Sequence, residues 1–178
     1  DQLRAEGLTT LPFRQDIRVV TMPGCIDGWV ALNERFGSMP LAEVIQPAID
    51  LAEYGFPASP LLVGAVRQLD SRGAEALHEL SSQATSVGAV VRRPGVARAL
   101  RAVASGGRDG FYLGEFGQGL KELGNGLFHD RDLEQSSAEW VTPLTSSAFG
   151  VDLHTIPPNS QGYLTLGAAS LLDGIDLG

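Results

Sequence analysis

The side chains that could do chemistry in this sequence are few and scattered. Its three histidines, His78, His129 and His154, lie far apart, with no second ligand at the short spacing typical of zinc sites. The single cysteine, Cys25, excludes an internal disulfide. It begins an expected helix, where the helix dipole favours a thiolate. No histidine lies near it in the sequence, so we interpret Cys25 as a small buried thiol. We expect no metal site and no cofactor.

Glycine-rich and acidic motifs offer further alternatives. The run Gly106-Gly107-Arg108-Asp109-Gly110 invites a phosphate-loop interpretation, but no Lys-Ser/Thr follows it and no clear strand precedes it. Punctuation between two helices explains the run better. The acidic pairs Asp130/Asp132 and Asp173/Asp176 are of a kind common at helix ends. No G-x-S-x-G nucleophile turn is present. We therefore assign no catalytic residue, no cofactor-binding residue and no metal ligand to this chain.

Composition limits the partners. The chain has 178 residues, 43% of them hydrophobic, which is enough for one domain with an ordinary core. Its net charge of −8 argues against nucleic acid as a partner. We interpret the one basic cluster, Arg92-Arg93 with Arg98 and Arg101, as a solvated helix face. No apolar run approaches the roughly 20 residues that a membrane span needs, so no membrane partner is expected.

A strand, a turn and two helices are expected in the first third of the chain. The alternation from Ile17 to Met22 predicts a short strand, which turns at Pro23-Gly24. From Ile26 to Phe36 apolar residues recur every three or four positions, which predicts a helix with one buried face. A second helix is expected from Ser38 to Ala52, with a kink or break at Pro47 because proline removes a backbone hydrogen bond there.

The remaining pattern predicts an α+β fold, a helix-rich chain with a small, mostly antiparallel sheet. Further helices are expected at about 61–72, 74–80, 96–104, 110–123 and from Asp130 onward, with Asp109 capping the fourth of them. Strands at 140–147 and 151–156 form a hairpin, and a loop at 157–162 leads into a last helix at 163–172. We expect a helical part at about 24–139 and a hairpin with the last helix at about 140–178.

Three stretches together resemble the large subunit of the gamma-glutamyltranspeptidase family. The first is MPGCIDGWVALNERFGSMPLAEVIQPAIDLAEYGF, beginning at Met22, which is similar to the family's V-P-G-x-x-x-G-W segment, its (K/R)-(F/Y)-G-x-(L/M)-P helix and its P-A-I-x-L-A-x-x-G-F run. The second is GGRDGFYLGE, from Gly106 to Glu115, and the third runs from Phe149-Gly150 to Gly162. They occur in the family's order, so the resemblance covers 17–178 nearly throughout.

The resemblance implies an N-terminal-nucleophile hydrolase. In that family a precursor cuts itself, and the freed Thr that begins the small subunit attacks a γ-glutamyl or related acyl amide. The acyl group then passes to water or to an amine. The intact fold is implied to be an αββα sandwich. We expect the nucleophile beyond Gly178, so this chain would depend on a small subunit as its partner and would be inactive alone.

Other family features match only in part. Thr9-Thr10 precedes the V-P-G segment and is interpreted as a loop pair, and the family's substrate-gripping arginine is not carried over to Arg4 or Arg14, whose surroundings differ. The P-P-x-S-x-G loop matches Pro157–Gly162, with Asn159 and Gln161 as variants that favour the acylase-like branch. We favour a role in orienting the last helix over ligand contact for this loop.

Two expectations concern the chain as a whole. Because it begins at Asp1 without an initiator Met, we expect a processed product or an excised piece, and we expect it to associate through apolar surface that a partner normally covers. The alternative function is a non-catalytic interaction module that retained the family's helices. A gene continuing past Gly178 into a strand that begins with Thr would favour the enzyme, and a natural stop codon the module.

Overall fold

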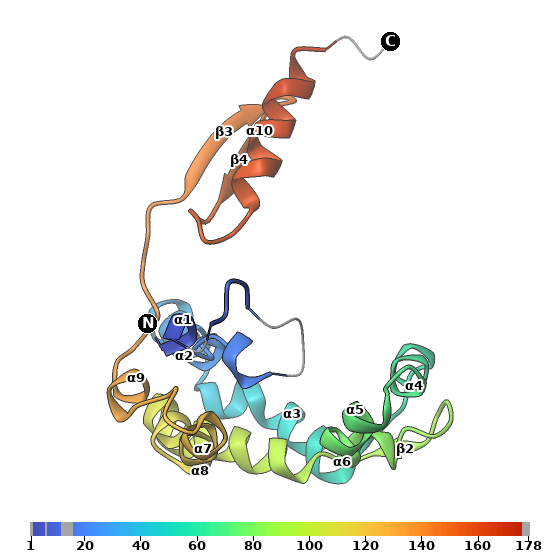
Figure 1. Ribbon diagram of the computed structural model, residues 1–178. Helices are drawn as coiled ribbons and strands as arrows, with labels where there is room; N and C mark the ends of the chain where they lie inside the picture. The colour runs from blue at the N-terminus through green and yellow to red at the C-terminus, as the bar shows by residue number, and fades with distance from the viewer. Residues whose placement is uncertain (1, 6, 12–15, 176–178) are drawn as a thin grey trace. The chain divides into compact units, whose positions relative to one another are not determined.

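The computed structural model of the protein describes residues 2–5, 7–11 and 16–175, so Arg14 and Asp176 lie outside the described residues. The described chain forms two compact units, one over Asp1–Ala138 and one over Glu139–Gly178. The first is helical and the second is a hairpin with one helix (Figure 1). The expected α+β class is confirmed.

Helices dominate the first unit. Its elements are α1 Gln2–Ala5, the 3-10 helix η1 Ile17–Val19, α2 Cys25–Phe36, α3 Leu41–Tyr54, β1 Phe56–Pro57, α4 Pro60–Arg67, α5 Ser71–Ala76, α6 His78–Ser81, β2 Val90–Val91, α7 Pro94–Tyr112, α8 Glu115–Gly124 and α9 Asp130–Glu134. The second unit holds β3 Leu144–Ala148, β4 Val151–Thr155 and α10 Gly162–Asp173. Among the described helices none is both long and apolar enough to cross a membrane.

The core of the first unit forms where α7 packs along α3 and also against α2, α8 and α9. Helix α3 contributes Ile45, Ile49 and Ala52, whose spacing places them on one face. The buried residues of this cluster are Ile26, Ile45, Ile49, Val103, Tyr112, Leu120, Phe128 and Leu133. A second, smaller cluster consists of Ala58, Val63, Ala84 and Val91, beside the antiparallel β1–β2 bridge.

The strand expected from Ile17 to Met22 is absent, because η1 occupies Ile17–Val19 instead. The Asp16 carboxylate accepts hydrogen bonds from the Arg18 backbone N–H at 2.9 Å and from its guanidinium at 2.6 Å. Such local side-chain bonds offer the backbone an alternative to strand pairing. The hydrogen bond from the Arg18 side chain is also the main reason that the pKa of Asp16 falls to about 2.

The helix α2 forms where expected, but its apolar face is largely exposed. Ile26 is buried, whereas Trp29, Leu32 and Phe36 are 40%, 53% and 67% exposed. They line a shallow groove of about 490 Å³ together with residues of α3. Periodicity identified the apolar face, but it did not show that most of this face stays exposed.

Proline and glycine act differently in α3 and α7. Helix α3 is continuous through Pro47, so the break allowed for there is absent. Helix α7 runs from Pro94 to Tyr112 with a sharp joint at Gly107, whose φ of 56° and ψ of −137° are not helical. The punctuation expected at the glycine pair is therefore present. Asp109, however, lies inside α7 and caps nothing, because the helix resumes directly after Gly107.

The expected hairpin is confirmed in the second unit, and both of its strands are shorter than expected. Leu144 pairs with Thr155 and Ala148 with Val151 in an antiparallel register. Phe149 and Gly150 have φ values of 53° and 75°, as a tight two-residue turn requires. The Phe149 N–H donates to the Asp173 carboxylate at 2.7 Å, which joins the turn to the end of α10. Helix α10 packs on both strands (Figure 1).

Candidate functional site

The loop Pro157–Gly162 joins β4 to α10. The Ser160 hydroxyl accepts a hydrogen bond from the Gly162 N–H at 3.2 Å, so a serine at this position supports the turn before the helix. A Cβ at Gly162 would overlap the Thr155 side chain, which explains why glycine stands there. Asn159 and Gln161 are exposed. The loop is thus held by its own backbone and serine, and its amide side chains remain accessible.

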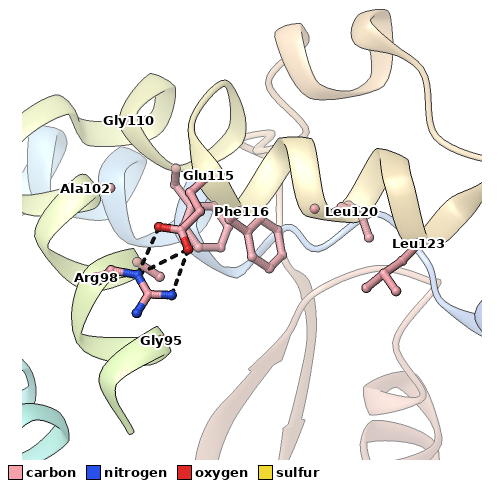
Figure 2. A pocket seen from close by; sticks show the side chains of 11 residues that line it. Gly95, Arg98, Ala102, Gly110, Glu115, Phe116, Leu120 and Leu123 are labelled. Carbon is pink, nitrogen blue, oxygen red and sulfur yellow. Dashed lines mark hydrogen bonds and ion pairs between the residues drawn. The ribbon is translucent and has the colours of Figure 1, made fainter. Parts of the chain in front are cut away.

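A hollow of about 260 Å³ lies between α7 and α8 (Figure 2). Small residues of α7 and the stacked rings of Phe111 and Phe116, with centroids 4.0 Å apart, form most of its wall. At its edge the Arg98 Nη2 donates to Glu115 Oε1 at 2.8 Å, and this hydrogen bond lowers the pKa of Glu115. The hollow is smaller than most ligand sites, which span about 300–1,000 Å³. The two charged side chains among its described lining residues, Arg98 and Glu115, form an ion pair.

A buried ion pair lies at the centre of the first unit, between Asp27 of α2 and Arg108 of α7. The Asp27 side chain is 2% exposed and that of Arg108 is 15% exposed. Arg108 Nε lies 2.7 Å from Asp27 Oδ1, although its N–H is not aligned for a hydrogen bond. The guanidinium carbon also lies 4.7 Å from the centroid of the Tyr112 ring. Burial on this scale makes the pair sensitive to loss of either partner.

Arg108 Nη2 and Asp27 Oδ2 bind residues of the segment 133–137, and Arg108 Nη1 lies 3.4 Å from the Asp109 carboxylate. Arg108 Nη2 donates to the carbonyl oxygens of Leu133 and Gln135 at 2.6 and 2.7 Å. Asp27 Oδ2 accepts from the backbone N–H and the hydroxyl of Ser137 at 2.7 and 3.0 Å. These contacts bring together α2, α7 and the segment after α9.

Tyr112 completes the network and is fully buried. Its hydroxyl donates to the Pro23 carbonyl and accepts from the Asp27 N–H at 3.3 Å. Burial is the main reason that the pKa of this phenol is raised above its ordinary value of 10.0. The first two motifs of the sequence, which begin at Met22 and Gly106, therefore meet at one buried polar cluster.

The structure separates most of the residues weighed for chemistry. Cys25 is exposed, so its interpretation as a buried thiol was wrong. It is the first residue of α2, and it is Ile26 and Asp27 that face inward. His129 caps α9, and the His154 ring nitrogen lies 2.9 Å from the Thr145 hydroxyl. Over the described ranges, no group of three or more histidine, cysteine and acidic side chains could hold a metal ion.

Three of the four arginines in the basic cluster form ion pairs. Arg93 pairs with Glu79 at 2.6 Å, Arg98 pairs with Glu115, and Arg101 pairs with Glu53. Because these three guanidinium groups have acidic partners, the cluster offers a phosphate less net positive charge than its four arginines would suggest.

Sequence reasoning missed the Asp27–Arg108 pair. One signal was available: Asp27 interrupts the apolar run between Ile26 and Val30, and a charged residue at an inward position requires a partner. No feature of the neighbouring sequence indicated which basic residue would pair with Asp27.

The chain matches a known protein family over almost its whole length. The profile of the gamma-glutamyltranspeptidase family matches residues 4–178. The chain belongs to this family, and the resemblance stated from the three motifs is confirmed.

Individual relatives support the family assignment. The glutathione hydrolase-like YwrD proenzyme of Bacillus subtilis (strain 168) is 29% identical over 187 residues, covering 96% of this chain and 34% of the relative. The acylase ACY 1 proenzyme of Pseudomonas sp. (strain SE83) is 32% identical over 172 residues, covering 90% of this chain and 30% of the relative. The chain thus spans about a third of the curated relatives it matches.

A solved structure extends the comparison to the fold. The crystal structure of cephalosporin acylase from Bacillus halodurans superposes with a TM-score of 0.84 at 28% identity. It covers 99% of this chain and 35% of that chain.

Proposed function

We propose that the whole protein cleaves amides of γ-glutamyl or related acyl groups, passing the acyl group to water or to an amine, and that this chain is part of its large subunit. The observation that carries the proposal is the family match over 4–178. Relatives whose names describe a glutathione hydrolase-like protein and an acylase support the amide substrate.

The reacting group belongs to another part of the protein in this proposal. The chain spans about a third of relatives that are described as proenzymes, which supports a second, small subunit as its partner. A Thr freed at the start of that subunit would attack the amide carbonyl, with its own α-amine taking the proton and backbone N–H groups stabilising the oxyanion. The chain by itself is then inactive.

The acyl preference leans toward the acylase-like branch. Asn159 and Gln161 are exposed beside Ser160, at two positions where many transpeptidases have Ser and Gly. The likeness to an acylase and to a cephalosporin acylase supports the same direction. We propose that the protein accepts an acyl group without the α-amine of glutamate at least as well as one with it.

A pair of chromogenic substrates tests both points. The full-length, self-cleaved protein is assayed on γ-glutamyl and glutaryl 4-nitroanilides, which differ only in the α-amine. Release of nitroaniline that is lost when the small subunit's first Thr is changed to Ala supports the proposed class. A kcat/KM on the glutaryl substrate that equals or exceeds that on the γ-glutamyl substrate supports the acyl preference, and a lower value contradicts it.

Two outcomes would contradict the proposal. Release by the isolated 178 residues would place the nucleophile within this chain. No release by the full-length protein from either substrate would favour the non-catalytic interaction module instead.

A further inference from the structure

The feature that the proposed reaction leaves unused is the set of contacts that Asp27 and Arg108 make with residues 133–137. Arg108 Nη2 binds two carbonyl oxygens there, and Asp27 Oδ2 binds the Ser137 N–H and hydroxyl. A buried pair could have satisfied its polar atoms on α2 and α7 alone. It holds a third segment instead.

That segment is the end of the first unit, which closes at Ala138. Leu133 is 1% exposed and is the last strongly buried residue before the hairpin. From 136 to 143 the chain has neither helix nor strand, and it then enters β3. With so little apolar burial, the backbone after Leu133 depends on polar contacts to hold its position.

We propose that Asp27 and Arg108 act as a clamp that fixes the point at which the chain leaves the first unit, and that a fixed end of this unit is needed for full turnover in the reaction. Asp27 and Arg108 are thus positioning residues that touch no substrate. This inference rests on the proposed function, because it assigns the clamp a role in that reaction.

Loss of the clamp is expected to lower the turnover number, kcat. A substitution far from the reacting atoms can lower a rate about a hundredfold when it misplaces the reacting groups by about 1 Å. Loosening the clamp should therefore lower kcat more than it raises KM.

The test compares variants of the full-length protein. Arg108→Lys keeps the positive charge, but one ammonium group cannot reach Asp27 and both carbonyl oxygens. Ser137→Ala removes only the hydroxyl contact, so it should remain folded if Arg108→Lys does not. Val63→Ala is the matched control, because Val63 is 3% exposed but belongs to the second cluster. The assay temperature is set equally far below each variant's unfolding midpoint.

Two quantities are measured: amide hydrogen exchange of residues 133–143, and kcat and KM on the preferred anilide. We expect exchange in this segment to rise about tenfold in Arg108→Lys, corresponding to about 1.4 kcal/mol of local stability. We expect kcat to fall about ten- to a hundredfold. Ser137→Ala should show a smaller change in both, and Val63→Ala neither.

Unchanged exchange at 133–143 in Arg108→Lys and Ser137→Ala would overturn the clamp. Raised exchange with the same kcat as Val63→Ala would overturn its role in positioning. If the wild-type protein turns over neither anilide, the proposed function fails and the positioning role fails with it, whereas the exchange data still decide whether the clamp exists.

Discussion

At the scale of single residues, the first unit is notable for charge in its interior. Asp27 and Arg108 form an ion pair and each also binds the segment 133–137, and Tyr112 links the Asp27 N–H to the Pro23 carbonyl. A buried pair contributes little net stability compared with apolar residues, but removing one partner typically costs about 3–5 kcal/mol. Its value therefore lies in which segments it holds together.

The Tyr112 hydroxyl can be tested separately from the ion pair. Tyr112→Phe leaves the Pro23 carbonyl and the Asp27 N–H without their partner, so we expect the free energy of unfolding to fall by about 1–3 kcal/mol at neutral pH. Urea unfolding of the 178-residue chain measures this. Tyr54→Phe is the control, because Tyr54 is 69% exposed.

Comparison with the same variant also tests how the Tyr112 phenol makes the stability of the wild type depend on pH. Burial raises the pKa of the Tyr112 phenol, so the unfolded chain loses this proton first as pH rises. The stability that the neutral phenol contributes is full below the unfolded pKa of about 10 and is lost as pH rises through the higher folded pKa. The free energy of unfolding of the wild type should therefore decline more steeply than that of Tyr112→Phe as the pH rises above about 10. Equal slopes would contradict this.

At the scale of elements, glycines decide how α7 and α8 meet. A Cβ at Gly117 would overlap the Tyr112 carbonyl and lie 3.3 Å from Leu133 Cδ1, whereas a Cβ at Gly119 meets nothing within 4 Å. Close packing therefore requires a glycine at position 117 of α8 but not at position 119.

Substituting each of these glycines separates the two effects. Gly117→Ala should lower the free energy of unfolding by about 1–3 kcal/mol, because backbone must shift to admit the methyl group. Gly119→Ala should raise it by up to about 1 kcal/mol, because alanine favours the helix. Thermal or urea unfolding of the two variants gives the comparison, and a stabilising Gly117→Ala would show that the α7–α8 contact is looser than described.

At the scale of the whole molecule, the chain exposes much apolar surface. The groove between α2 and α3 includes Trp29, Leu32 and Phe36, and in the second unit Leu164 and Leu171 of α10 are 55% and 74% exposed. Exposed apolar patches of this kind favour association. The relatives are about three times longer than this chain, which is consistent with surfaces that further residues cover.

We therefore expect the isolated 178 residues to associate in solution. Light scattering over a concentration series should show a rising mean mass. Phe36→Ser should reduce association by removing apolar area from the groove, whereas Leu61→Ser, at a residue that is 86% exposed but outside it, should have less effect. A monomer of constant mass at high concentration would contradict the expectation.

Local patterns predicted the elements that depend on neighbouring residues. Three such features could be predicted because residues within a turn or two govern each of them. They are the buried face of α3 with Ile45 and Ile49, the joint at Gly107 and the turn at Phe149-Gly150. Asp16 shows the limit, since its carboxylate accepts hydrogen bonds from the Arg18 backbone and side chain, and a 3-10 helix forms where a strand was expected. The three motifs predicted the family, but not how the first two contact one another.

The sequence by itself determined the α+β class, the hairpin, most of the helices and the family, because periodicity, turn residues and motifs are properties of contiguous residues. Only the tertiary structure decided that Cys25 points outward, that most of the α2 apolar face is exposed and that Asp27 meets Arg108. Burial and ion pairing depend on which distant segments come together. In this chain that is decided by how α7 packs against α2, α3 and the segment after α9.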